Sequence, residues 1–96
     1  MVKKISYYSV FWYDTDGINI RFPDVGALSC ADTKEEAIFM AEDALCLWLH
    51  GMKLQEVPPK TSLEDIVLNE HEELVEITVE MQIINEKLFS PNVQKL

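Results

Sequence analysis

The sequence predicts an α+β fold, a two-layer sandwich in which one helix lies across an antiparallel sheet. Three observations predict it. Residues 5–13 are rich in the aromatic and β-branched side chains of a central strand covered on both faces. Residues 33–50 follow a capping motif and carry an apolar stripe at helical spacing. Residues 74–83 alternate apolar and polar side chains, as a half-buried strand does. At 96 residues, the chain has the length of one domain.

The first strand is expected to continue into a hairpin and a short third strand. An Asp-Thr-Asp-Gly turn ending at Gly17 tolerates the positive φ angles of a tight hairpin. Residues 18–22 then alternate with their apolar side chains on one face, and Pro23 ends the strand because it has no N–H for the ladder. Residues 27–31 form the third strand, which is antiparallel because the connection to it is short.

The helix has the clearest boundaries. Thr33 and Glu36 have the spacing of a capping box, and Gly51 is placed to end the helix in the left-handed conformation. The side chains expected to lie on the sheet are Ala37, Ala41, Ala44 and Trp48, which repeat at helical spacing, and the flanking Ile38, Leu45, Leu49 and Met52.

A proline pair at residues 58–59 predicts a rigid, extended linker, and residues 61–68 predict a short helix or a turn. The returning strand completes the order: three strands, a helix and a strand. This predicts an α+β domain over residues 1–84 and a C-terminal tail over residues 85–96.

The formal net charge of −9 bears on possible partners. Such a surface repels phosphate backbones, so direct nucleic-acid binding by this chain alone is disfavoured. Seven acids and no Lys or Arg occur from Glu64 to Glu80. They form either a solvated face or a surface that attracts a basic partner, and charge alone does not separate these alternatives.

No cofactor or metal site is expected. Cys30 and Cys46 form no CxxC or Cys/His cluster, and His50 and His71 lie far apart in the sequence. With three glycines, the chain has no phosphate-binding loop. No apolar run approaches the roughly 18 residues of a membrane helix. The aromatic stretch that follows the basic N-terminus does not fit a signal peptide, so a cytoplasmic protein is expected.

An enzyme would need a constellation of catalytic groups. Asp14, Asp16, Asp24 and Asp32 lie at strand ends or turns, where clustered carboxylates hold Mg²⁺ in nucleases. Turn formation, strand termination and helix capping explain these acids more simply. We therefore predict a chain that is not an enzyme, and a Mg²⁺ nuclease is kept only as a third hypothesis.

Several segments, in order, resemble the HicB-type antitoxins of toxin–antitoxin pairs. Residues 16–24, 32–37 and 41–49 are similar to that family's signature. A Pro-rich piece at residues 57–62 and the last strand follow as they do in the family. The resemblance covers about residues 4 to 82. It implies an incomplete RNase-H-like α+β fold that lacks the catalytic carboxylates.

The resemblance also implies a partner, a small basic HicA-type ribonuclease toxin whose active site the antitoxin covers. The acid-rich surface fits that role, because opposite charges speed encounter and fix orientation. We expect the contacts to come from exposed acids of the turns and the helix, namely Asp14, Asp16, Asp24, Glu42 and Asp43. The alternative is an orphan HicB-like regulatory module that self-associates as a homo-oligomer and has no toxin.

Two departures from the family limit what is carried over. After Asp24 the family usually has a hydrophobe-Pro-Gly step, and here Val25-Gly26 is shorter and lacks the proline. Family members usually continue into a DNA-binding segment, and this sequence ends at Leu96. Operator binding is therefore not expected of this chain.

Overall fold

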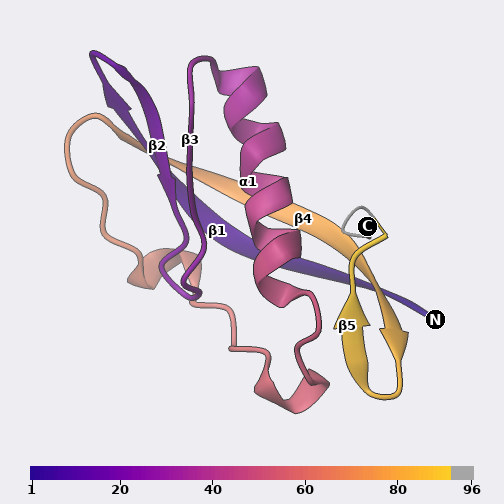
Figure 1. Ribbon diagram of the computed structural model, residues 1–96. Coiled ribbons are helices and arrows are strands. Elements are labelled where there is room, and N and C mark those ends of the chain that lie inside the picture. The colour runs from indigo at the N-terminus through magenta and orange to yellow at the C-terminus, as the bar shows by residue number, and fades with distance from the viewer. Residues whose placement is uncertain (92–96) are drawn as a thin grey trace.

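A five-stranded antiparallel sheet, with one long helix on one face, makes up the computed structural model, which describes residues 1–91 (Figure 1). The strand order is β3-β2-β1-β4-β5, so β1 is the central strand, as its aromatic and β-branched composition predicts. The elements are β1 Val2–Asp14, β2 Gly17–Arg21, β3 Leu28–Ala31, α1 Lys34–Leu49, β4 Glu72–Ile84 and β5 Lys87–Phe89, with short 3-10 helices at Leu54–Glu56 and Leu63–Asp65.

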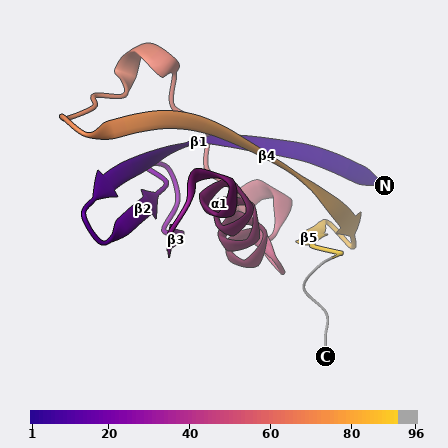
Figure 2. The same cartoon turned by 90° about the horizontal axis from the view of Figure 1, so that it is seen from above.

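The core lies between the sheet and α1. Figure 2 shows the helix beneath one face of the sheet, and the segment before β4 on the opposite side. Alternate residues of each long strand point at the helix, as the period of two requires. The α+β two-layer prediction is confirmed. The largest fully buried apolar side chains are Tyr7, Phe11, Ile20, Leu45, Leu49, Ile77, Met81 and Leu88.

The strand count corrects the expectation. We predicted a three-stranded antiparallel sheet plus one returning strand, but the sheet has five strands. The additional strand, β5, lies in the stretch assigned to a tail. Asn85 and Glu86 both adopt positive φ angles, 54° and 64°, which turn the chain from β4 into β5. Beyond β5, the Gly51 amide donates to the Leu88 carbonyl, so the segment after α1 covers that edge.

The ends of α1 follow the sequence closely. The Glu36 amide donates a 3.2 Å hydrogen bond to the Thr33 hydroxyl, as a capping box requires. The Glu36 carboxylate accepts from the Asp32 amide at 2.8 Å, one residue earlier than the box predicts. Gly51 has a φ of 85° and ends the helix in the left-handed conformation.

The linker between α1 and β4 is tied back to the sheet. The Tyr7 hydroxyl donates to the Pro58 carbonyl, and the Lys60 ammonium lies 4.4 Å from the centroid of the Tyr8 ring. The short helix or turn predicted for residues 61–68 is the 3-10 helix at Leu63–Asp65. Among residues 1–91, no helix has the length and apolar character needed to cross a membrane.

Candidate functional site

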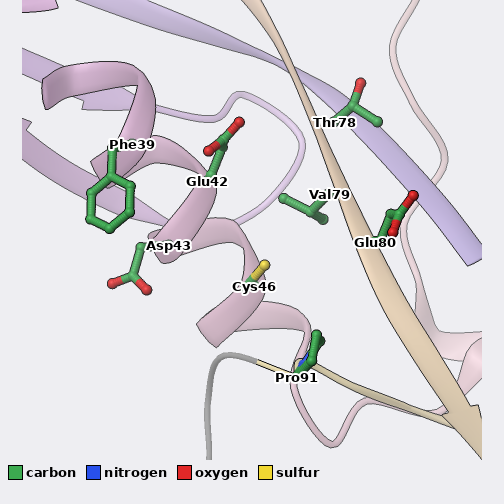
Figure 3. Close-up of a pocket in the computed structure, with 8 residues that line it drawn as sticks. All are labelled: Phe39, Glu42, Asp43, Cys46, Thr78, Val79, Glu80 and Pro91. Atoms are coloured by element: carbon green, nitrogen blue, oxygen red, sulfur yellow. The ribbon is translucent and has the colours of Figure 1, made fainter. Parts of the chain in front are cut away.

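A groove of about 540 Å³ lies between α1 and β4 (Figure 3). Val79 points from β4 toward the helix, and the Cys46 sulfur lies on the helix side facing β4. Glu80 points away from the helix. The groove is lined by Phe39, Glu42, Asp43, Cys46, Thr78, Val79, Glu80 and Pro91.

The helical wall of the groove arises directly from the sequence. Phe39, Glu42, Asp43 and Cys46 are spaced so that they share one side of α1. Phe39 is 65% exposed although it is a large apolar residue, and Cys46 is buried. The groove therefore offers an exposed aromatic ring beside two carboxylates, which suits an occupant that is both apolar and cationic.

The charged side chains that line the groove are all acidic, namely Glu42, Asp43 and Glu80. Within residues 1–91, no ion pair reaches Glu42, Asp43 or Glu80. Burial raises the pKa of the Cys46 thiol, and the nearby carboxylates of Asp43 and Glu42 raise it further against the lowering effect of a hydrogen bond with Ser90. The groove thus holds Cys46 as a neutral thiol and presents free carboxylates.

The acids of β4 behave differently from those of α1. Three of its glutamates each form an ion pair with a base from another element, so the stretch from Glu64 to Glu80 is not one uniformly unpaired negative face. Hydrogen bonds from these bases lower the pKa of each carboxyl group. The pairs are Arg21–Glu72 at 2.8 Å, Lys34–Glu73 at 2.7 Å and Lys60–Glu76.

Asp14 is the last residue of β1 and Asp16 lies in the turn to β2, and both line the same shallow cavity as Asp32. Asp14 also accepts a 2.7 Å hydrogen bond from the Thr15 amide, which is the local turn role expected of it. No three His, Cys, Asp or Glu side chains within residues 1–91 are arranged to hold a metal ion.

Asp24 lies at the opposite end of β2 from that turn. Its carboxylate accepts a 2.9 Å hydrogen bond from the Thr61 amide and a second from the Thr61 hydroxyl. The predicted contact residues therefore occupy three separate places. The structure brings Asp14 near Asp16 and Glu42 near Asp43 but does not unite them in one site.

Sequence reasoning did not select Phe39, Thr78 or Glu80 as site residues. The alternation of residues 74–83 places Thr78 and Glu80 on the outward side of the strand, but it does not say which strand edge lies open. Phe39 carried a usable signal, since it is a large apolar residue off the predicted stripe that includes Ala37 and Ala41.

Comparison with known proteins identifies the family. A family model described as "HicB_like antitoxin of bacterial toxin-antitoxin system" matches residues 10–96. A search of curated proteins gave no match. The family match spans the groove, the acidic turn and the whole of β4. The chain therefore belongs to the HicB-like antitoxin family of bacterial toxin–antitoxin systems.

Proposed function

We propose that this chain is a cytoplasmic antitoxin that neutralises a small basic ribonuclease toxin of the HicA type by covering its active site. In this proposal the chain catalyses no reaction, and its RNase-H-like scaffold serves only to present carboxylates. The observation that carries the proposal is the groove in which Glu42 and Asp43 lie beside the exposed Phe39 ring and form no ion pair with any residue of the described range 1–91. Opposite charge at such a surface steers encounter, and an apolar anchor slows release.

In this proposal the predicted contact residues have two roles. Asp14, Asp16, Glu42 and Asp43 serve as contacts in this proposal, because they line open cavities on the surface. Asp24 serves as an anchor for the linker, because both of its oxygens accept hydrogen bonds from Thr61.

Charge reversal tests the proposal. The double variant Glu42→Lys/Asp43→Lys should lose affinity for a cognate HicA-type toxin and fail to protect cells that express it. The matched control is Glu64→Lys/Asp65→Lys, which changes the net charge equally at exposed residues of the 3-10 helix at Leu63–Asp65. An equal loss of affinity in both variants would show that overall charge, and not the groove, causes the effect. Failure of every HicA-type toxin to bind the unaltered chain would overturn the proposal.

Salt dependence gives a second readout. Exposed charges are screened beyond about 8 Å at physiological ionic strength, so the association rate should fall as salt rises. The double variant should lose most of that dependence, while the control retains it.

A second candidate function is that of an orphan, self-associating module. It is favoured by Trp12 and Leu28, which line one cavity on the sheet face away from α1 and are 45% and 74% exposed. Molar mass by light scattering at several salt concentrations separates the two functions. A homo-oligomer that is insensitive to salt and ignores HicA-type toxins would favour the orphan module.

A further inference from the structure

Among residues 1–91, part of the outer edge of β4 has no neighbouring strand. The inner edge pairs with β1 from Glu72 to Gln82, whereas β5 pairs with the outer edge only from Gln82 to Ile84. Within residues 1–91, no strand pairs with the outer edge between Glu72 and Met81. An edge of this kind presents N–H and C=O groups that can template an added strand.

The register shows which backbone groups face outward. The Ile83 amide donates to the Met1 carbonyl and the Tyr13 amide donates to the His71 carbonyl, so odd-numbered residues of β4 exchange hydrogen bonds with β1. Antiparallel pairing alternates, so the backbone N–H and C=O groups of even-numbered residues point the other way. Of the even-numbered residues along the open edge, Thr78 and Glu80 are the two that line the groove.

The groove provides room for a strand at that edge. Its far wall is the side of α1 that carries Phe39, Glu42 and Asp43, and Val79 points into it from β4 (Figure 3). A strand added here would alternate its side chains between two environments. On one face they would meet Phe39 and the helix acids, and on the other they would lie beside Thr78 and Glu80.

Charge selects the occupant. A second copy of this chain at the same edge would bring the acids that line the groove, among them Glu42 and Glu80, close to the same acids of the first copy. Each molecule also carries a net charge of −9. Like charges directly opposite one another destabilise a strand pair. A strand that carries Lys or Arg between apolar residues would instead pair favourably on both faces.

We infer that a basic, extended segment of the partner adds to the open edge of β4 as a further strand, pairing with the backbone of Thr78 and Glu80 beneath Phe39. This inference rests on the proposed function and specifies how the toxin is held. Main-chain hydrogen bonds supply affinity, and the acids on both sides of the edge supply the preference for a basic strand.

Amide hydrogen exchange, followed residue by residue by NMR, tests the pairing. In the free chain, the Thr78 and Glu80 amides should exchange quickly while those of Ile77 and Val79 are protected by β1. The probe is a HicA-type toxin that binds in the charge-reversal experiment. On its addition, exchange at Thr78 and Glu80 should slow by at least about tenfold.

A matched pair of helix variants tests the groove wall. Phe39 and Leu47 are similarly exposed on α1, at 65% and 61%, but only Phe39 lines the groove. Phe39→Ala should weaken toxin binding about tenfold or more, whereas Leu47→Ala should leave it unchanged. Both variants remove exposed side chains, so the fold should survive, and circular dichroism checks this.

The outcomes separate the two proposals. Toxin binding with unchanged exchange at Thr78 and Glu80, or with equal effects of the two alanine variants, overturns the added strand and leaves the antitoxin function standing. Absence of binding by every HicA-type toxin overturns both. Protection of Thr78 and Glu80 in the chain alone, growing with its concentration, assigns the edge to a second copy and overturns the basic strand.

Discussion

The carboxylate of Asp24 accepts hydrogen bonds from both the backbone amide and the hydroxyl of Thr61. These hydrogen bonds join the loop between β2 and β3 to the linker between α1 and β4. With the bond from Tyr7 to Pro58, it fixes the course of a segment whose own 3-10 helices bury no residue. The linker has no core of its own, and these polar contacts hold it together with Leu54 and Val57, which pack against the main core.

Asp24→Ala should therefore lower the free energy of unfolding by about 2 kcal/mol, because hydrogen bonds to a charged acceptor are lost on a partly buried residue. Urea denaturation measures the change. Asp43→Ala, at an exposed helix position, is the matched control and should change stability by less than about 0.5 kcal/mol. Equal destabilisation in both variants would contradict the anchoring role.

Gly17→Ala should destabilise the fold more than Gly51→Ala does. Gly17 has a φ of 141°, and an added Cβ would lie 2.8 Å from the Ala31 carbonyl oxygen. We expect a loss of about 2 kcal/mol, from steric overlap and backbone strain together. At Gly51 the φ is 85° but nothing lies within 4 Å of an added Cβ, so only the conformational cost of about 1 kcal/mol remains. Thermal and urea unfolding of the two variants provide the comparison.

Glu73 should make stability depend on pH in the acid range. Hydrogen bonds from Lys34 and Tyr13 lower the pKa of its carboxyl group below 4.5 in the folded chain. The ionised carboxylate therefore stabilises the fold above that value, and the contribution disappears as the pH falls through the folded pKa. Glu73→Gln should be less stable than the unaltered chain at neutral pH, and the difference should shrink below pH 4.5. A difference in unfolding free energy that stays constant with pH would contradict this role of Glu73.

Tyr13 reports on the same contact at alkaline pH. Its hydroxyl donates a 2.6 Å hydrogen bond to Glu73, which raises the pKa of Tyr13 from 10.0 to about 12, with burial as a smaller cause. The stabilisation is complete below pH 10 and is lost as the pH rises toward 12. In Glu73→Gln, NMR titration of the tyrosine rings should show the Tyr13 pKa moving back toward 10.0. The pKa of Tyr7, which burial raises and which makes no hydrogen bond to Glu73, should not move.

The parts of the fold that sequence predicts are those fixed by local chemistry. Thr33 and Gly51 delimit α1 because capping groups act within a few residues of the helix ends. The returning strand follows from strict alternation between residues 74 and 83. By contrast, β5 follows a turn whose second residue is Glu86, where a two-residue hairpin usually has glycine, so the turn carries little signal in the sequence.

The candidate site depends on strand order, which local pattern does not contain. Glu42 and Asp43 were predicted as exposed helix acids, yet nothing in the sequence places them opposite Thr78 and Glu80. The stretch from Glu64 to Glu80 contains no base, but Arg21, Lys34 and Lys60 reach its glutamates from distant segments. Within the described part of the chain, long-range ion pairs determine which acids have a basic partner and which have none.

The carboxylates thus fall into one set that holds the fold together and another that is available for binding a partner. Glu72, Glu73 and Glu76 knit β4 to three other segments, while Glu42, Asp43 and Glu80 hold no such bond among the described residues. The second set can therefore be rewritten without loosening the scaffold. A library randomised at Glu42, Asp43 and Glu80, with Glu72, Glu73 and Glu76 unchanged, should yield stable proteins with altered partner specificity. Such a surface can change in evolution together with its partner while the fold stays intact.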